Sequence, residues 1–137
     1  MSYLLDTNVL SELVRAKPDP AVLAWFEQVP DDSLHISVLT LGEIRKGVEM
    51  VADVRRKEKL RLWLEHTLPD WFEGRLLPID EPVAEQWGRL LAEAGRTLPA
   101  VDSLLAATAL HHGLRMVTRN AQDFRVPGLE VVNPWGD

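Results

Sequence analysis

Short apolar runs alternate with longer segments of helical periodicity along this chain. Five apolar runs bounded by turn residues predict strands at residues 3–6, 34–37, 76–79, 115–118 and 130–132. Strands that alternate with helices favour a parallel sheet that is covered on both faces. We therefore predict an α/β fold, an α/β/α sandwich whose parallel sheet has about five strands.

The segments between these runs place apolar residues on one helical face. The helical segment from residue 37 to about 50, for example, has one apolar stripe, made of Val38, Leu41, Ile44 and Val48. The predicted helices cover residues 9–15, 21–28, 37–50, 54–71, 82–94 and 101–112. The two helices between the second and third strands fit a right-handed crossover with an inserted helical hairpin. No repeat or linker interrupts the pattern, so we expect one domain over residues 1–137.

The charge balance does not by itself decide between classes of partner. The net charge is −6, with 21 Asp and Glu against 15 Lys and Arg, whereas nucleic-acid-binding proteins usually show a basic face. A cluster of carboxylates, however, can hold cations that attract phosphates. The lack of cysteine excludes disulfides and thiolate metal sites and fits a cytoplasmic location. No apolar stretch of roughly 18 residues is present, so we expect no membrane partner.

Four acidic residues recur where a strand gives way to a helix or where a helix begins. They are Asp6, Glu43, Asp102 and Asp123. In a parallel sheet the carboxyl ends of strands and the amino ends of the following helices share one edge, where ligands bind. Hard cations such as Mg²⁺ take oxygen ligands and keep several waters, so two to four carboxylates suffice. The pattern thus predicts a candidate acidic metal site.

Each of these acids also has an ordinary structural interpretation. Asp102 fits a residue that compensates the helix dipole, and Asp6 fits a plain turn residue. Glu43 lies off the apolar stripe of its helix, so periodicity alone places it in solvent. Asp123 fits a capping arrangement that starts at Asn120. The pattern alone therefore indicates a site and not a function.

Three polar residues lie beside these acids in the sequence. Thr7, Asn8 and Thr118 are candidates to orient carboxylates or a metal-bound water, although ordinary turn and cap chemistry is the simpler explanation for each one alone. The four histidines are scattered, and we assign none of them a role. No catalytic Ser-His-Asp spacing, glycine-rich phosphate loop or zinc pattern is present.

Several blocks of the sequence, taken in order, form a specific pattern. The first block is Leu-Asp-Thr-Asn at residues 5–8, within 4–11. The others are 37–47, 77–80, 101–109 and 117–120 with Asp123 and Phe124, and the chain closes with 133–135. In this order the blocks resemble the PIN-domain ribonucleases, and more closely the VapC-like toxins of type II toxin–antitoxin (VapBC) pairs.

The resemblance implies a set of metal ligands. The acids that bind metal in the family match Asp6, Glu43 and Asp102. The family often has a fourth acid directly after a Thr-Arg pair, and this chain has Asn120 there, with Asp123 one turn further on. We expect one Mg²⁺ or Mn²⁺ on Asp6 and Asp102, and the number of metal ions stays open.

The resemblance also implies metal-assisted hydrolysis of RNA phosphodiester bonds. Glu43 would be either a ligand or the base for the attacking water. Arg119, Arg45 and Lys46 would contact RNA phosphates, which position RNA without reading its sequence. Solvated surface charge is the alternative for these three residues. The RNA target is not given by the sequence.

The partners implied are a cognate VapB-like antitoxin that lays a peptide across the acidic groove, a second copy of the chain, and operator DNA through the antitoxin alone. Segments 21–28 and 54–71 carry aromatic residues that suit either a helical partner or the core. These residues are Trp25, Phe26, Trp63 and Trp71.

Three other functions compete with this interpretation. A PIN-fold module that binds RNA or a partner without cutting is kept open by Asn120. A phospho-receiver would need a second acid beside Asp6 and a lysine after the last strand, where Asn133 and Pro134 stand. A haloacid-type phosphatase would need an Asp at position 8, which is Asn8.

Overall fold

A five-stranded parallel sheet organises residues 1–136, the part of the chain that the computed structural model describes. Its strands lie in the order β3-β2-β1-β4-β5, and every neighbouring pair is parallel. The strands are β1 (Tyr3–Leu5), β2 (Leu34–Ser37), β3 (Leu76–Leu77), β4 (Arg115–Val117) and β5 (Val131–Val132). The predicted parallel α/β sheet is confirmed.

The central strand, β1, is buried on both faces of the sheet. Tyr3 and Leu5 belong to one hydrophobic core and Leu4 to the other, as the alternation of side chains along a strand requires. A three-residue apolar run with no polar side chain is typical of a strand in a doubly covered parallel sheet. The sheet therefore separates two cores.

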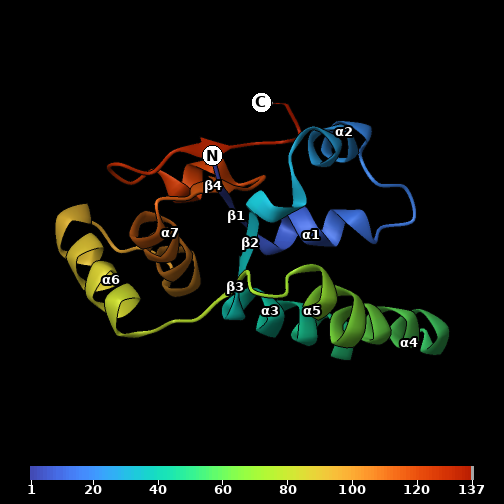
Figure 1. Cartoon of the computed structure of the whole chain (residues 1–137). Coiled ribbons are helices and arrows are strands. Elements are labelled where there is room, and N and C mark those ends of the chain that lie inside the picture. The colour runs from blue at the N-terminus through green and yellow to red at the C-terminus, as the bar shows by residue number, and fades with distance from the viewer. Residues whose placement is uncertain (137) are drawn as a thin grey trace.

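Helices cover the two faces unequally (Figure 1). The first core packs beneath α1 (Thr7–Leu13), α2 (Pro20–Gln28), α3 (Val38–Glu49) and the arm that begins with α4 (Val54–Leu62). The second core packs beneath α6 (Glu81–Ala94) and α7 (Ala100–His112), which lie against each other. Two short 3-10 helices, Asp31–Ser33 and Ala121–Phe124, precede β2 and follow β4.

The segment predicted as one helix over residues 54–71 is interrupted. After α4 the chain widens into a π-helical turn, Trp63–Thr67, and then continues as α5 (Leu68–Trp71). Pro69, in the first turn of α5, has no N–H and cannot close a normal helical hydrogen bond. The wider turn lies directly before it, where the regular ladder must be broken. The predicted hairpin is present, since α3 packs against α4.

The aromatic residues of α2 and α5 are mostly used in packing. Tyr3 and Trp25 meet edge to face with ring centroids 5.2 Å apart, and Phe26 lies 5.2 Å from Trp25 and 5.9 Å from Trp71. These three helical aromatics pack against the first core while staying partly exposed. The core-packing alternative therefore describes Trp25, Phe26 and Trp71.

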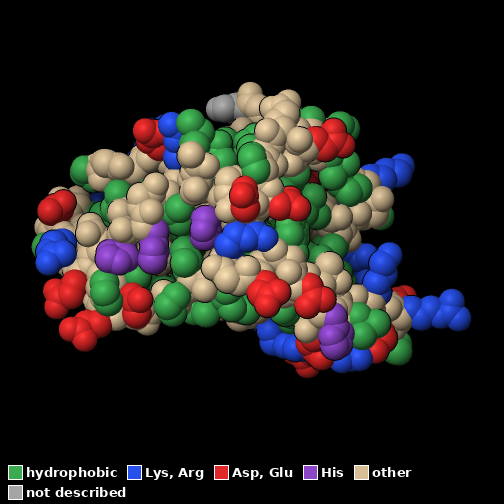
Figure 2. All heavy atoms as spheres, in the orientation of Figure 1, with side chains coloured by type: hydrophobic (Ala, Val, Ile, Leu, Met, Phe, Trp, Pro, Cys, Tyr) green, Lys and Arg blue, Asp and Glu red, His purple; other side chains and the backbone are tan. Residues whose placement is uncertain are grey.

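Charged side chains are unevenly spread over the surface. Figure 2 shows acidic side chains gathered over α6 at one end, and lysine and arginine side chains projecting from the region of α4 at the other. The net charge of −6 therefore coexists with a local concentration of basic side chains around α4. No helix in residues 1–136 is long and apolar enough to cross a bilayer.

Candidate active site

Asp6 lies at the carboxyl end of β1 and is the N-cap of α1. Its Oδ1 accepts a hydrogen bond from the Thr7 backbone N–H at 2.8 Å, and its Oδ2 accepts one from the Thr118 hydroxyl at 2.7 Å. Its own N–H donates to the carbonyl of Val117 at 2.9 Å. Only 7% of the residue is exposed. Asp6 is therefore a helix cap and, at the same time, a fixed carboxylate at the edge of the sheet.

Glu43 reaches the same edge from α3. The Thr7 hydroxyl donates to its Oε1 at 2.6 Å. Ile44 and Val48 are buried, whereas Glu43 is exposed, as the periodicity of α3 predicts. Periodicity does not show, however, that α1 packs beside α3 and presents Thr7 to this exposed position. The solvent-facing glutamate is thus part of the acidic edge.

Asp102 lies on α7, and the charges of the other acids affect its pKa. It lies in the first turn of that helix, half-buried. Burial, followed by the negative charges of Asp6, Asp123 and Glu43, raises its pKa to about 6. The pKa of Asp6 is also raised, mainly by burial, although the hydrogen bonds from Thr118 and Thr7 oppose the shift. Four carboxylates, which we call the acidic centre, therefore act on one another.

Asn120 and Asp123 differ in what they bring to the acidic centre. The Asn120 backbone N–H donates to the Thr118 hydroxyl oxygen at 3.0 Å, so Asn120 supports the residue that holds Asp6. Asp123 lies in the 3-10 helix after β4, and its charge contributes to the raised pKa values of Asp6 and Asp102. Asp123 therefore supplies the fourth negative charge.

Two of the three flanking polar residues that the sequence singled out contact this centre, and the third contacts the neighbouring Arg119. Thr7 and Thr118 each donate a hydroxyl hydrogen bond to an acid, and the Asn8 Oδ1 accepts from the Arg119 N–H at 3.4 Å. Each contact joins segments far apart in the sequence. Together they fix the ends of β1, β4 and α3 around the acidic centre.

The donor chemistry of the acidic centre suits a hard divalent cation. All its donors are oxygens, and burial together with the charges of the other acids raises the pKa of Asp102. Within residues 1–136 no three acidic or histidine side chains stand close enough to enclose an ion directly. Mg²⁺ keeps several of its waters and needs only one or two direct carboxylates, so an open arrangement of this kind fits it.

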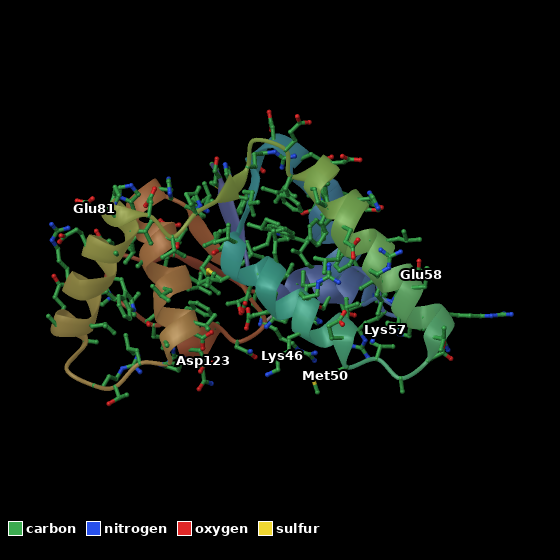
Figure 3. The ribbon with its side chains drawn as sticks, turned by 90° about the horizontal axis from the view of Figure 1, so that it is seen from below. Lys46, Met50, Lys57, Glu58, Glu81 and Asp123 are labelled. Atoms are coloured by element: carbon green, nitrogen blue, oxygen red, sulfur yellow. The ribbon has the colours of Figure 1, made fainter. Side chains whose placement is uncertain are left out.

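The predicted phosphate-binding cations have different surroundings. Arg45 is paired with Glu65 at 2.9 Å and with Glu49 at 3.5 Å, so its charge is already balanced. Lys46 is exposed on α3 and makes no ion pair within residues 1–136, and Figure 3 shows it and Asp123 along the same edge of the molecule as seen from below. The guanidinium of Arg119 lies over the Trp135 ring, 5.1 Å from its centroid. These surroundings favour Arg119 and Lys46 over Arg45 as phosphate contacts.

Two cavities flank the acidic centre. The apolar groove, of about 250 Å³, runs between α1, α3 and α4 and reaches Thr7 and Glu43. The arginine pocket, of about 480 Å³, lies beside Asp123. The groove is lined by Thr7, Ser11, Val14, Arg15, Glu43, Ile44, Gly47, Val48, Arg56, Leu60 and Trp63. The pocket is lined by Arg119, Asn120, Ala121, Gln122, Asp123, Arg125 and Asn133.

Sequence reasoning missed Arg125 and Asn133 because they lie in irregular segments after β4 and β5. It also missed Glu12, a buried acid that accepts from the Asp19 N–H at 2.8 Å and pairs with Arg15. Its only signal in the sequence was a charge on an apolar helical stretch. Glu12 ties α1 to the segment that enters α2, away from the acidic centre.

Known proteins resemble the chain over its full length. The PIN domain family model matches residues 3–128. Toxin FitB of Neisseria gonorrhoeae is 37% identical, over 98% of this chain and 99% of that protein. VapC ribonuclease Y4jK of Sinorhizobium fredii is 36% identical over 96% of each. The crystal structure of FitAcB from Neisseria gonorrhoeae superposes with a TM-score of 0.90 at 36% identity, covering 97% of this chain and 98% of that one. The chain therefore belongs to the PIN-domain family, among the relatives of FitB and the VapC ribonucleases.

Proposed function

We propose that the chain is a metal-dependent endoribonuclease, the toxin of a type II toxin–antitoxin pair that acts in the cytoplasm. The observation that carries the proposal is the convergence of Asp6, Glu43, Asp102 and Asp123 on one sheet edge, where burial and then the charges of the other three acids raise the pKa of Asp102 to about 6. Relatives over the whole chain, such as Y4jK, are named as VapC ribonucleases. Both lines of support point to hydrolysis of RNA.

In this proposal Asp6 and Asp102, with Glu43 beside them, would hold Mg²⁺ or Mn²⁺. The ion would polarise the scissile phosphate and lower the pKa of a water. Thr118 and the Thr7 N–H keep both oxygens of Asp6 in place.

The proton of the attacking water also needs an acceptor. Glu43 is exposed and held by the Thr7 hydroxyl, so its free oxygen is placed to take that proton. The water oxygen then bonds to phosphorus while the bond from phosphorus to the leaving ribose oxygen breaks, and that oxygen takes up a proton from solvent to leave as a hydroxyl group.

The apolar groove suits the expected antitoxin. Apolar side chains of α3 and α4, with Trp63, form its walls, and Glu43 stands at one end. An amphipathic peptide that buries its apolar face there would bring a basic side chain to the acidic centre, where charge-assisted contacts are strong. Solved relatives include FitAB bound to a DNA fragment, and we propose that this chain likewise meets operator DNA through its antitoxin. We further propose that the toxin is a homodimer.

A PIN-fold module that binds RNA or a partner without cutting it is the second candidate. Asn120 favours it, because an amide replaces the charge that the family often has at that position. Asp123 argues against it, since its charge reaches Asp6 and Asp102.

The test is cleavage of a structured RNA by purified protein with and without Mg²⁺ or Mn²⁺. We expect Asp102→Asn to lower the rate by about 10³-fold, since metal-assisted charge stabilisation contributes several kcal/mol. Asp70→Asn is the matched control, because Asp70 is an exposed acid in the first turn of α5. Equal cleavage by the wild type and Asp102→Asn, or cleavage that persists in EDTA, would overturn the proposal. RNA binding without cleavage would favour the second candidate.

A further inference from the structure

The arginine pocket lies next to the acidic centre but is not needed to hold a metal ion. Its volume of about 480 Å³ is within the range of small-ligand sites, roughly 300–1,000 Å³. Asp123 lines it, and the charge of Asp123 reaches Asp6 and Asp102. A ligand group in this pocket would therefore sit beside any group at the acidic centre.

Among the described residues, the two arginines of this pocket outnumber its one carboxylate, Asp123, and neither forms an ion pair with it. Arg119 and Arg125 are both exposed, and within residues 1–136 neither makes an ion pair. By contrast, Arg15, Arg45 and Arg115 are each paired with a glutamate. The pocket thus concentrates free positive charge on one side of a negatively charged site.

The pocket also presents hydrogen-bond donors in fixed positions. Arg119 is held over the Trp135 ring, and its backbone N–H is bound by Asn8. The Asn133 Oδ1 accepts from the Trp135 N–H at 2.9 Å. Because that oxygen is engaged, the two N–H donors of the Asn133 amide are left for the pocket. Guanidinium and amide donors beside a metal-binding centre suit a polyanion whose phosphates span both places.

We propose that the arginine pocket is a subsite for the nucleotide next to the scissile bond of single-stranded RNA. Arg119 and Arg125 neutralise the adjacent phosphate, and the amide of Asn133 donates to the edge of the base. The inference rests on the proposed nuclease function and adds a direction: the RNA leaves the acidic centre over β4 and β5 and not along the apolar groove. Unstacked bases in single strands are open to such contacts.

Binding is measured in the Asp102→Asn background, where cleavage is suppressed, with a labelled single-stranded RNA over a series of salt concentrations. Adding Arg125→Gln is expected to weaken binding several-fold at low salt and to reduce the slope of log affinity against log salt by about 0.7, the value for one lost phosphate contact. Arg125→Lys should keep most of the slope because it keeps the charge. Arg89→Gln, at an exposed position of α6, is the control and should change neither quantity.

Cleavage kinetics distinguish failure of the subsite from failure of the nuclease. In the otherwise wild-type protein, Arg125→Gln should raise KM for RNA with kcat nearly unchanged, and Asn133→Ala should alter the preference among RNAs that differ at one flanking base. If the wild type cleaves RNA while Arg125→Gln matches Arg89→Gln in both KM and salt slope, the subsite is wrong and the nuclease stands. If Arg125→Gln instead impairs only antitoxin binding, the pocket belongs to the partner and the proposal is overturned. If the wild type cleaves no RNA, both proposals fall.

Discussion

The two cavities beside the acidic centre are built from different parts of the chain and have opposite chemistry. Three helices form the apolar groove, where Arg15 is paired with Glu12 and the Arg56 guanidinium donates to the Val14 carbonyl at 3.4 Å. Segments that follow β4 and β5 form the arginine pocket, whose Arg119 and Arg125 have no such partner in residues 1–136. One site can therefore serve two ligands, an apolar peptide on one side and a polyanion on the other.

The difference in chemistry follows from the kind of structure that lines each cavity, helices in one case and turns after strands in the other. An amphipathic helix must place apolar side chains toward its neighbours, so the space between α3 and α4 is lined by residues such as Ile44, Val48 and Leu60. The turns beyond parallel strands carry polar side chains that meet at the sheet edge, where ligands bind. An apolar wall and a polar wall on either side of one acidic centre are thus consequences of the fold.

The largest effect that would separate the two sides is expected at Trp63. Truncation to alanine should weaken antitoxin binding by about 30- to 1,000-fold, because a buried aromatic hot spot contributes roughly 2–4 kcal/mol to an interface. Cleavage of RNA by the free toxin should change little, since Trp63 lines only the apolar groove. Titration calorimetry with the antitoxin and an RNA cleavage assay measure the two effects.

The control for Trp63→Ala is Val54→Ala, a change at a residue of α4 that is 81% exposed and outside the groove. Because Trp63 also packs against the first core, thermal unfolding of each variant is recorded first. Unchanged antitoxin affinity in a folded Trp63→Ala protein would show that the antitoxin does not bind in the apolar groove.

A smaller effect, on thermal stability, is expected from the acidic centre, which lies between the apolar groove and the arginine pocket. The pKa of Asp102 is about 6 in the folded protein and 3.8 in the unfolded chain, so the folded state binds more protons between these values. Its contribution to stability therefore falls as pH rises from about 4 to 6. Without metal, Asp102→Asn should unfold a few degrees above the wild type at pH 7, and this difference in unfolding temperature should shrink by about half at pH 5 and close near pH 4.

The lowered pKa of His112 has the opposite dependence over part of this range, because burial disfavours its charged form. The comparison of wild type with Asp102→Asn removes that contribution, since both proteins carry His112. Thermal unfolding in EDTA, followed by circular dichroism, measures the difference. If the difference in unfolding temperature between the two proteins stays constant from pH 7 to pH 5, the pKa of Asp102 is not raised in the folded protein.

The sheet and its order of elements were predictable because short apolar runs and helical stripes are local patterns. The exposure of Glu43 was predictable for the same reason, but its role was not, because that depends on α1 presenting Thr7 across 36 residues of sequence. The π-helical turn before Pro69 was missed, since a proline near a helix end permits several outcomes. The arginine pocket was missed because irregular segments carry no period from which their neighbours can be inferred.

The central claim is that the acidic centre binds a divalent cation through Asp102, and Mn²⁺ binding followed by electron paramagnetic resonance tests it most directly. The wild type should bind Mn²⁺ at neutral pH and lose affinity as pH falls below about 6, because protons compete for Asp102. Asp102→Asn should weaken binding by at least about tenfold, the lower end of the effect seen even for residues that only support metal ligands, and Asp70→Asn should not. Equal Mn²⁺ affinity in the wild type and Asp102→Asn would contradict the claim.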